Sequence, residues 1–476
     1  MNVIDYLENN SKKYPEKNAI ISEDEKISYK ELYEQVQNFS LSISTLNKQG
    51  VISLIAENSI SFIITYLGII KAGLIVHITS TEISEINLLN QIKSSNSQLI
   101  VCSEKIFDNI SKYSKIKIPI LKLSELKAVS NIEEKTFKEN QIAHLIYTSG
   151  TISEPKGVGI THSMIEFTTK NIVNVLGYSN SDIDVLPLPL YHSFGLGCFH
   201  TSMAVGSTVI LHKDASHLQN LLDSIKKFSA TTIAATPATL TKFSKLYNTD
   251  LVDYFSNLRL VITNSTAIPK STIQSFREIL KNGNLATYYG LTEASRSTFM
   301  IFQEDTTRDD SVGKPAPEVN IRIEQNGNSR GEILVKGKNV ISKYWNNEMA
   351  DENLIDGWLR TGDIGFLDKE NFLFLKGRKD DIINVGGEKV IPFEIEEVVK
   401  QIPEVEDVAA YGIENEIFGQ VIKLQVVKSI ESNLDKSKIL IHCLKNLEKF
   451  KVPTKIDFVE KIPKTSYGKV KRFMLK

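Results

Sequence analysis

The stretch of sequence that decides the fold is IAHLIYTSGTISEPKG, residues 142–157, in which an apolar run leads directly into a hydroxyl-rich turn. The apolar run, residues 142–146, predicts a buried strand, and the glycine, serine and proline that follow predict a loop at its end. Backbone N–H groups of such a turn, hydroxyl groups and a lysine can all converge on phosphate oxygens. The stretch therefore predicts a phosphate-binding loop, with a polar surface loop as the alternative.

One well-known phosphate loop can be tested directly. Gly150 and Lys156 have the separation found in the GxxxxGK[ST] loop of nucleotide-binding proteins. Pro155, however, stands where that loop needs its second glycine, and Gly157 stands where it needs the serine or threonine that binds magnesium. The loop therefore belongs to another class, and its meaning depends on the rest of the chain.

Outward from this loop, short apolar runs alternate with amphipathic helical patterns in both directions along the chain. Alternation of strands with helices is typical of α/β layers with a largely parallel sheet, so we expect an α/β fold. Helices are predicted at residues 216–228 and 269–280, and strands at residues 51–56, 98–102, 208–211, 231–235 and 258–263.

The pattern changes after Asn320. Short strands separated by turn signals predict a small β-rich subdomain, with the turns at residues 326–327, 356–357 and 368–371. We therefore expect a large N-terminal domain, residues 1–377, that combines α/β subdomains with this β-rich subdomain.

A polar segment, GRKDD at residues 377–381, separates this part from the C-terminal region. That region mixes a predicted helix at residues 392–401 with a predicted strand at residues 421–427. Its length and pattern are typical of a small domain, so we expect an α+β C-terminal domain at residues 378–476.

Composition narrows the class of protein. With 476 residues the chain is too long for one ordinary core, and 41% hydrophobic residues with a formal net charge of -1 are ordinary for a globular protein. This charge gives no electrostatic reason to expect nucleic acid or a membrane surface as a partner. The size of the chain suits an enzyme.

The cysteines, the N-terminus and one apolar run bear on the compartment. Cys102, Cys198 and Cys443 form no CxxC pair and have no matching histidine spacing, so neither a disulfide framework nor a zinc site is expected. The N-terminus lacks the features of a signal peptide. The apolar run at residues 60–77 is interrupted by Lys71, and its helical spacing predicts a buried helix and no membrane span. We expect a cytoplasmic protein.

Further blocks follow the phosphate loop in a fixed order: YYGLTE at residues 288–293, GWLRTGD at 357–363, GRKDD at 377–381 and PKTSYGKVKR at 463–472. With the loop itself, TSGTISEPKGV, these blocks resemble motifs of the adenylate-forming superfamily, which comprises acyl- and aryl-CoA synthetases, peptide-synthetase adenylation domains and beetle luciferases. The resemblance covers nearly the whole chain. In the loop, Ile152 and Ser153 depart from the family's usual threonine and glycine, although a serine still offers a hydroxyl.

This resemblance implies an ATP site. The loop would hold the β- and γ-phosphates through Thr148, Ser149, Gly150, Thr151 and Lys156. In YYGLTE an aromatic face can stack on adenine, a glycine allows close backbone approach and a threonine can meet a phosphate, which assigns Tyr289, Gly290 and Thr292 to the nucleotide. Glu293 would supply a hard oxygen to Mg²⁺.

The later blocks imply the remaining residues that act on ATP. The carboxylate of Asp363 can accept hydrogen bonds from both ribose hydroxyls, and Arg378 would also reach the nucleotide. Lys469 would be the catalytic lysine that bridges the acid and the α-phosphate. Asp380 falls on the hinge about which the family's mobile C-terminal domain swings.

The acceptor and the acid are implied by two further resemblances. Gly386 and Gly387 resemble the glycine strand that lines the family's pantetheine tunnel, where a ligand passes close to backbone. LPLPLYHSFGLG at residues 186–197 resembles the LPLxHxxG segment of acyl- and aryl-CoA synthetases, which implies His192 as an active-site residue at the edge of the acyl pocket. A structural histidine beside Phe194 is the alternative.

The residues of the acyl pocket bear on the class of acid. Domains that adenylate α-amino acids carry an aspartate where Ser193 stands, so an α-amino acid is disfavoured. Asn264 and Ser265 stand where the family's pocket wall usually has little or no side chain. Their bulk should shorten the pocket, which favours a short, aromatic or polar acid over a long fatty chain.

The function expected from the sequence is ATP-dependent activation of a small carboxylic acid to acyl-AMP with release of pyrophosphate, followed by transfer to the pantetheine thiol of CoA. Loading of a separate carrier protein in trans is the alternative, because no carrier domain follows Arg472. A catalytically silent nucleotide-binding protein is a remote alternative, disfavoured because Lys469, Glu293 and Asp363 are all present.

Overall fold

The computed structural model describes residues 2–23, 25–46, 50–113, 115–125, 140–148, 156–246, 251–325, 330–429, 432–464 and 470–475. The described residues fall into two compact units. The first unit comprises Met1–Asn320 and Val335–Leu359, and the second comprises Ile321–Leu334 and Arg360–Lys476. The domain boundary that we expect after Gly377 stays a prediction.

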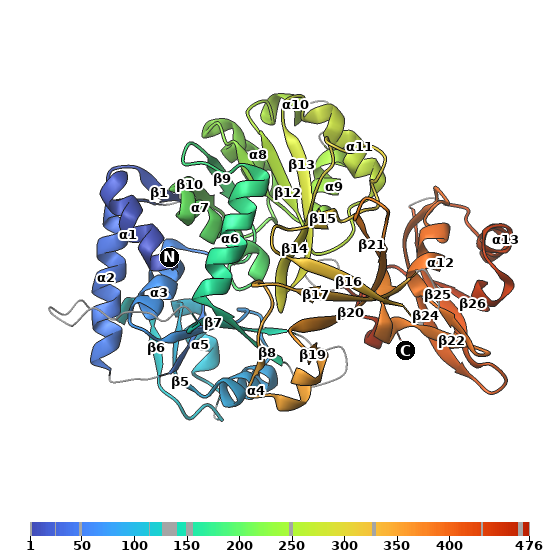
Figure 1. The fold of residues 1–476 in the computed structure, drawn as a ribbon, viewed down its shortest axis with the longest axis horizontal. Coiled ribbons are helices and arrows are strands. Elements are labelled where there is room, and N and C mark those ends of the chain that lie inside the picture. Colours follow the sequence, from blue (N-terminus) through green and yellow to red (C-terminus); the bar gives the residue numbers. More distant parts are fainter. Residues whose placement is uncertain are drawn as a thin grey trace. The chain divides into compact units, whose positions relative to one another are not determined.

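One sheet of the first unit is mostly parallel and has the strand order β15-β14-β13-β12-β11-β9-β10-β1-β2 (Figure 1). Its parallel strands run from β1 to β13 in that order, and β2, β14 and β15 pair antiparallel at its two ends. The strands are β1 (Asn18–Ile21), β2 (Lys26–Ser28), β9 (Ile183–Leu186), β10 (Thr208–Leu211), β11 (Thr232–Ala234), β12 (Leu260–Thr263), β13 (Asn284–Leu291), β14 (Ala294–Ile301) and β15 (Lys314–Pro315).

A second sheet of the first unit has the order β18-β8-β7-β4-β3-β5-β6. All residues of its β3 are buried, as expected for a parallel strand that is covered on both faces. The strands are β3 (Val51–Ile55), β4 (Ile75–Ile78), β5 (Ser97–Cys102), β6 (Ile120–Lys122), β7 (Ile142–Thr148), β8 (Lys156–Thr161) and β18 (Tyr344–Trp345).

Helices cover these sheets, and in Figure 1 α8 and α11 lie beside the strands from β9 to β13. The strands and helices predicted in this region are confirmed. The helices are α1 (Val3–Lys13), α2 (Tyr29–Thr45), α3 (Ile60–Lys71), α4 (Glu85–Ser95), α5 (Glu104–Ile110), α6 (His162–Leu176), α7 (Ser193–Val205), α8 (Leu218–Lys227), α9 (Pro237–Leu246), α10 (Leu251–Tyr254) and α11 (Lys270–Ile279), with 3₁₀ turns η1 (Leu123–Glu125) and η2 (Glu348–Asn353).

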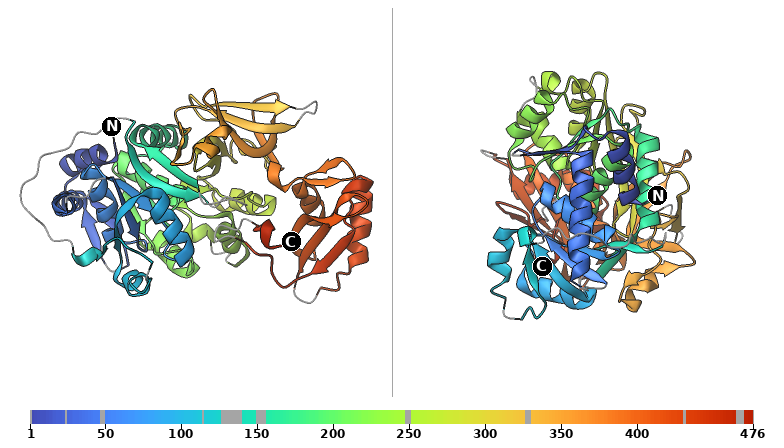
Figure 2. Two further views of the ribbon diagram at one scale, coloured as in Figure 1. Left: turned by 90° about the horizontal axis from the view of Figure 1, so that it is seen from below. Right: turned by 90° about the vertical axis from the view of Figure 1, so that its left-hand side faces the viewer.

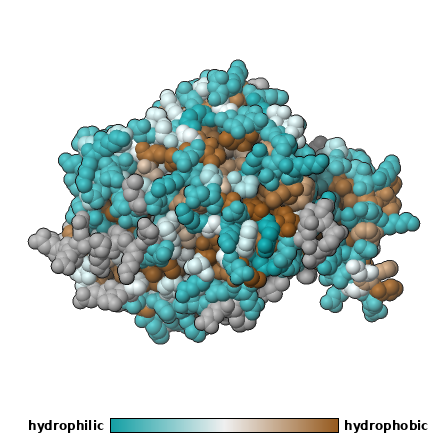
Figure 3. Space-filling view, in the orientation of Figure 1, coloured by the Kyte–Doolittle hydropathy of each residue, from teal (hydrophilic) through white to brown (hydrophobic). Residues whose placement is uncertain are grey.

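The apolar run at residues 60–77 is a buried helix followed by a strand. Gly73, with φ 74°, takes the left-handed conformation that ends α3, and β4 then includes His77. The prediction of a single helix is therefore wrong for the last residues of the run. Across the described residues, no helix has the length and apolar character needed to cross a membrane. Hydrophilic residues cover much of the face shown in Figure 3, with apolar areas between them.

Two further sheets are formed mainly by residues of the second unit: one has the order β16-β17-β20-β19 with β21 beside β20, and the other β23-β22-β25-β24 with β26 beside β25, while the short strand β19 falls within the first unit's range Val335–Leu359. Two helices pack against the second of these sheets, around a core that includes Ile395, Val399 and Leu424 (Figure 2). The elements are β16 (Asn320–Gln325), β17 (Gly331–Lys336), β19 (Leu354–Ile355), β20 (Trp358–Leu367), β21 (Leu373–Arg378), η3 (Lys379–Asp381), β22 (Ile383–Val385), β23 (Glu388–Val390), α12 (Pro392–Val399), β24 (Val405–Asn415), β25 (Gly419–Lys428), α13 (Lys436–Asn446), η4 (Lys449–Lys451), β26 (Lys455–Phe458) and η5 (Arg472–Met474).

The expected fold class is confirmed: a large N-terminal part with α/β layers precedes a β-rich region and a small C-terminal α+β part. Two of the predicted turns lie in the described residues. Asp356 and Gly357, with φ 51° and 76°, join β19 to β20, and the segment 368–371 joins β20 to β21. The third predicted turn, at residues 326–327, lies outside the described residues.

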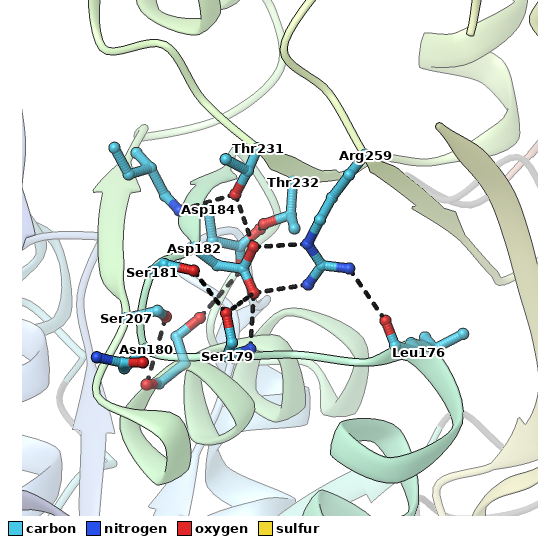
Figure 4. A network of polar contacts seen from close by, with 12 residues as sticks. Leu176, Ser179, Asn180, Ser181, Asp182, Asp184, Ser207, Thr231, Thr232 and Arg259 are labelled. Carbon is cyan, nitrogen blue, oxygen red and sulfur yellow. Dashed lines mark hydrogen bonds and ion pairs between the residues drawn. The ribbon is translucent and has the colours of Figure 1, made fainter. Parts of the chain in front are cut away.

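A polar network joins the central strands of the first sheet (Figure 4). The Nε and Nη2 atoms of Arg259, just before β12, donate to the two carboxylate oxygens of Asp182 at 2.7 and 2.6 Å. Thr231, just before β11, donates to the same carboxylate at 2.8 Å. Burial alone would raise the pKa of Asp182, but the hydrogen bonds from Arg259, Ser179 and Thr231 outweigh it and hold the pKa below its usual value.

The second carboxylate of this network, Asp184 on β9, is fully buried and has no cationic partner among the described residues. It accepts hydrogen bonds from Thr232 Oγ1 on β11 at 2.7 Å and from Ser202 Oγ on α7 at 3.1 Å. Burial raises the pKa of Asp184 to about 6, because the carboxylate form is poorly solvated there. The Asp184 side chain thus links β9 to α7, but it places a carboxyl group that can ionise in the core.

We expect Asp184→Asn to change how stability depends on pH. A carboxyl whose pKa is higher in the folded state stabilises the fold fully below its unfolded pKa of about 4, and this contribution is lost as pH rises through about 6. The asparagine variant should therefore gain up to about 3 kcal/mol relative to wild type between pH 4 and pH 7. Urea unfolding at both pH values measures this difference.

The matched control is Asp182→Asn, for which the opposite trend is expected. The lowered pKa of Asp182 means that its contribution is present above its unfolded pKa and is lost as pH falls. This variant should be most destabilised near neutral pH. Parallel pH profiles for wild type and Asp184→Asn would contradict the role of the buried carboxyl.

Candidate active site

The segments that carry the predicted active-site residues follow parallel strands of the first sheet. Strands β9, β11, β12 and β13 are neighbours and run parallel, so their carboxyl ends lie along the same edge. His192 and Ser193 follow β9, Asn264 and Ser265 follow β12, and Glu293 follows β13. Ligands of open α/β sheets bind at such an edge, so the topology gathers segments that are distant in the sequence.

The segment between β9 and α7 is held by a buried asparagine. Pro187 and Pro189 prevent regular structure there, which leaves backbone groups that need partners. Asn58 donates to the carbonyl oxygen of Leu188 at 2.8 Å and accepts from the N–H of Leu190 at 2.9 Å. These hydrogen bonds fix the path of the chain into α7.

His192 occupies the N-cap position of α7, and its ring centroid lies 4.7 Å from that of Tyr191. Burial lowers the pKa of His192 to about 4, because the imidazolium form would be poorly solvated. The ring is therefore neutral near pH 7 and can act as a hydrogen-bonding group without charge. Its predicted place at the edge of the acyl pocket stays a prediction.

The described residues define both ends of the predicted phosphate loop. Strand β7 ends at Thr148 and β8 begins at Lys156, and these two residues are partners across the antiparallel pair. The ends of the loop therefore lie side by side. Ser149, Gly150 and Thr151 lie outside the described residues.

Lys156 and Glu293 approach the same tyrosine, Tyr344 on β18. The Nζ atom of Lys156 lies 5.4 Å from the centre of the Tyr344 ring, and the Tyr344 hydroxyl donates to Glu293 Oε1 at 3.2 Å. A cation over an aromatic ring and a hydroxyl that donates to a carboxylate are both favourable contacts. The structure thus brings together two residues predicted to act on the triphosphate.

The sequence pattern did not single out Tyr344. It follows Glu293 by many residues in an unremarkable KYWN stretch, and its place depends on the pairing of β18 with β8, in which Tyr344 is the partner of Val158. Two residues, Tyr344 and Trp345, are too few to show a periodic hydrophobic pattern, so the sequence does not reveal such a contact. We add Tyr344 to the candidate site.

The YYGLTE block forms the end of β13 and the turn into β14. Tyr289 is 7% exposed, whereas Thr292 and Glu293 in the turn are partly exposed. A Cβ atom on Gly290 would lie 2.5 Å from the N atom of Arg296 and 2.7 Å from the carbonyl oxygen of Ala294. The glycine is therefore required by its own hairpin, and its approach to a nucleotide stays a prediction.

The described residues contain no cluster of three or more histidine, cysteine, aspartate or glutamate side chains that could hold a metal ion. Glu293 by itself suits Mg²⁺ that takes its other ligands from phosphate oxygens and water, as is usual where this ion accompanies a nucleotide. Its partly exposed carboxylate, oriented by Tyr344, fits such a role.

In the second unit, the structure brings Asp363 and Arg378 together. They are partners across the β20 and β21 pair, and Arg378 Nη1 donates to Asp363 Oδ1 at 2.9 Å. Glu332 supports the same stretch by accepting hydrogen bonds from Arg360 at 2.6 Å and from the N–H of Gly362 at 3.2 Å. Both residues predicted to reach the nucleotide from this part of the chain are therefore held in one place.

The remaining predicted residues of the second unit lie on exposed segments. Asp380 is exposed in η3, two residues after Arg378. Gly386 and Gly387 form the two-residue turn between β22 and β23, with φ 59° and 94°, so they lie in a hairpin turn and outside the strands themselves. Lys469 lies outside the described residues.

Asn264 and Ser265 follow β12 directly. Asn264 is partly exposed and its Oδ1 atom accepts a hydrogen bond from the N–H of Ser265, which has a φ of 91°. This conformation is uncommon for a residue other than glycine and is often found at functional sites. The two side chains lie at the sheet edge described above, where the acyl pocket is expected.

The α/β layers and the ordered motifs of the sequence are those of adenylate-forming enzymes. Residues 7–345 match the family model of the AMP-binding enzyme, and residues 394–469 match that of the AMP-binding enzyme C-terminal domain. The chain belongs to the AMP-binding enzyme family.

Known relatives match over nearly their whole length. The chain is 29% identical to the 2-succinylbenzoate–CoA ligase of Bacillus subtilis, covering 97% of this chain and 95% of the relative. It is 27% identical to the oxalate–CoA ligase of Arabidopsis thaliana, covering 98% and 96%. The solved structure of the o-succinylbenzoate CoA synthetase from Bacillus subtilis, in complex with its acyl-adenylate intermediate, matches with a TM-score of 0.89 and 26% identity, covering 99% of this chain and 97% of that one.

We expect Tyr344 substitutions to impair the step that uses ATP in proportion to what they remove. Tyr344→Phe loses the hydrogen bond to Glu293, worth about 1 kcal/mol, so ATP–pyrophosphate exchange should fall about 5-fold. Tyr344→Ala also removes the ring beneath Lys156 and should lower exchange about 20-fold or more. Unchanged exchange in Tyr344→Phe would show that the hydrogen bond to Glu293 is incidental, and equal loss in both variants would show that the ring contact with Lys156 is incidental.

Proposed function

We propose that this chain is an AMP-forming acid–thiol ligase that activates a small carboxylic acid with ATP and passes the acyl group to the thiol of CoA. The observation that carries this proposal is the contact of Lys156 and Glu293 with Tyr344, beside the loop that joins Thr148 to Lys156. The full-length similarity to enzymes named as CoA ligases supports the same reaction.

In the first half-reaction, a carboxylate oxygen of the acid attacks the α-phosphorus of ATP. The bond from this phosphorus to the bridging oxygen breaks, and pyrophosphate leaves with that electron pair. No protein nucleophile is needed, so the protein acts by positioning the reactants and by neutralising charge. Mg²⁺ that accompanies ATP would spread the charge of the triphosphate.

We assign the protein groups to this step as follows. Thr148, Lys156 and the loop between them hold the β- and γ-phosphates, and Glu293 would help to hold Mg²⁺. Asp363 accepts hydrogen bonds from the ribose hydroxyls while Arg378 keeps its carboxylate oriented. Lys469 bridges the acid and the α-phosphate, where its positive charge stabilises the transition state.

In the second half-reaction, the thiol sulfur of CoA attacks the acyl carbon, its proton leaves, and AMP departs with the electron pair of the acyl–oxygen bond. Gly386 and Gly387 form a turn without side chains, which suits the close passage of a pantetheine arm. We assign Asp380 to the hinge about which the C-terminal domain swings between the two half-reactions. Loading of a carrier protein in trans is the alternative use of the same thiol chemistry.

The acid is proposed to be short, aromatic or polar. The relatives are named for 2-succinylbenzoate and oxalate, and both of these acids are small and polar. His192, Ser193, Asn264 and Ser265 bring polar side chains to the expected acyl pocket. A reducing cytoplasm as the compartment rests on Cys102, Cys198 and Cys443, which are all buried free thiols.

The proposed function is tested with a panel of acids. We expect ATP–pyrophosphate exchange with 2-succinylbenzoate, oxalate or a related small acid, little exchange with a long fatty acid, and AMP with an acyl-CoA thioester once CoA is added. Thioester formation on a phosphopantetheinylated carrier protein, with none on CoA, would show that the acceptor is a carrier protein and not CoA. Absence of exchange with every acid would contradict the proposed function.

A second test concerns the catalytic lysine. Lys469→Ala should lower ATP–pyrophosphate exchange at least ~10²-fold, the loss typical when one preorganised donor is removed from a transition state. The matched control is Lys471→Ala, a neighbouring lysine in the same basic stretch, which should retain exchange close to that of wild type. Near-wild-type exchange in Lys469→Ala would remove this lysine from the mechanism.

A further inference from the structure

A buried arginine in the first unit, Arg296 on β14, lacks a countercharge. Its side chain is 3% exposed, and no aspartate or glutamate within the described ranges forms an ion pair with it. The more exposed Arg259, Arg277, Arg378 and Arg472 each pair with a carboxylate. Burying a cation without a countercharge is strongly unfavourable, so this position calls for an anion that the described residues do not supply.

The hydrogen bonds of Arg296 leave its charge uncompensated. Its Nη1 atom donates to Ser295 Oγ at 2.5 Å, and its Nη2 atom donates to the carbonyl oxygens of Ser193 and Phe194 at the long distances of 3.3 and 3.4 Å. All these acceptors are neutral. The Nε atom is buried and has no acceptor in the described part of the chain. A carboxylate can accept two parallel N–H groups from a guanidinium, which is the ligand geometry that arginine suits best.

The backbone is shaped to place this side chain. Arg296 has a φ of 55°, an uncommon value for a residue with a Cβ atom, and the pairing of β13 with β14 shifts register between Tyr289 and Leu291. Such bulges redirect side chains, often next to active sites. On α7, a Cβ atom at Gly197 would lie 2.0 Å from Arg296 Nη2, so the glycine makes room for the guanidinium.

The guanidinium lies among the residues assigned to the acyl pocket. It contacts the carbonyl of Ser193, the residue after His192, and lies 5.0 Å from the centre of the Tyr288 ring. Burial raises the pKa of Tyr288, and both Arg296 and Asn264 act against that rise, which places Asn264 near the same ring. Ser193, Asn264 and Gly197 in this group are partly exposed to solvent.

We propose that Arg296 binds a second, non-reacting carboxylate of the substrate, and that the acid activated by this chain is therefore a dicarboxylic acid. This inference rests on the proposed function. One carboxylate attacks ATP as described above, and the other remains unchanged while it pairs with the guanidinium. Arg296 is then a specificity-determining residue, because a monocarboxylic acid leaves its charge without a partner.

The test compares matched acids on wild type and Arg296→Gln. The pairs are 2-succinylbenzoate with 4-oxo-4-phenylbutanoate, which lacks the ring carboxylate, and succinate with butyrate. For the better dicarboxylic acid, we expect kcat/KM of pyrophosphate exchange to fall at least about 30-fold in Arg296→Gln, as when one partner of a buried charge pair is removed. Exchange with the matched monocarboxylic acid should stay within about 3-fold. Equal losses for both members of a pair would overturn the inference.

Thermal unfolding separates this role from a structural one. Because no described residue pairs with the buried charge, Arg296→Gln should keep or raise the unfolding midpoint, and the dicarboxylic acid should stabilise wild type but not the variant. Arg277→Gln is the matched control: it breaks the ion pair with Asp309 and should lower stability without altering the choice of acid. A lowered midpoint in Arg296→Gln with unchanged acid binding would identify a structural arginine.

Gly197→Ala provides an independent variant that keeps the charge. The added methyl group would displace the guanidinium from its place beside α7, so selectivity for the dicarboxylic acid should fall as in Arg296→Gln. A parallel measurement with MgATP tests whether the anion that Arg296 binds is a phosphate group of ATP or a carboxylate of the acid. Loss of stabilisation by MgATP in Arg296→Gln, with the acid's effect retained, would overturn the inference in favour of the nucleotide.

These outcomes are distinguishable from failure of the proposed function. If wild type exchanges pyrophosphate with no acid at all, the ligase reaction itself is contradicted. If wild type works equally well on both members of each pair and Arg296→Gln changes neither, the ligase reaction stands and the dicarboxylic acid is wrong.

Discussion

The paired carboxylates on the central strand of the first sheet are the constraint on which the rest of that unit depends. Asp182 and Asp184 flank the start of β9, and they bind groups at the starts of β11 and β12 and on α7. Buried polar groups are costly unless satisfied, so these bonds specify one register for neighbouring strands and one position for α7. Arg259 compensates the charge of Asp182, whereas Asp184 accepts its hydrogen bonds from hydroxyl groups of the described residues.

This arrangement positions the candidate active site because parallel strands end together. Once β9, β12 and β13 are in register, the residues that follow them are brought to one edge, although they come from distant parts of the sequence. The position of α7 also sets Ser193 and Gly197, the residues against which the Arg296 guanidinium packs. The core network and the residues predicted to line the acyl pocket are thus linked through α7.

Much of this could be predicted from the sequence, and the limits have physical causes. Apolar periodicity located the strands and helices, and ordered motifs located the family, but periodicity alone extended α3 past Gly73, whose left-handed conformation ends it. Tyr344 could not be predicted, because its contacts with Lys156 and Glu293 depend on β18 pairing with β8. Arg296 was missed for a similar reason, since a bulge in β14 decides where its side chain lies.

The contrast between Arg259 and Arg296 shows how a fold separates stability from selectivity. Arg259 faces a carboxylate of the same chain, so its charge is compensated whenever the protein is folded. Arg296 is far more buried and meets neutral acceptors, so the folded protein alone gains nothing from its charge. In such a binding site the ligand supplies the missing countercharge. The Arg296 charge is then compensated only when an acid with a second carboxylate is bound. The strained backbone of Arg296 and the space left by Gly197 are consistent with a side chain placed for binding at a cost to folding.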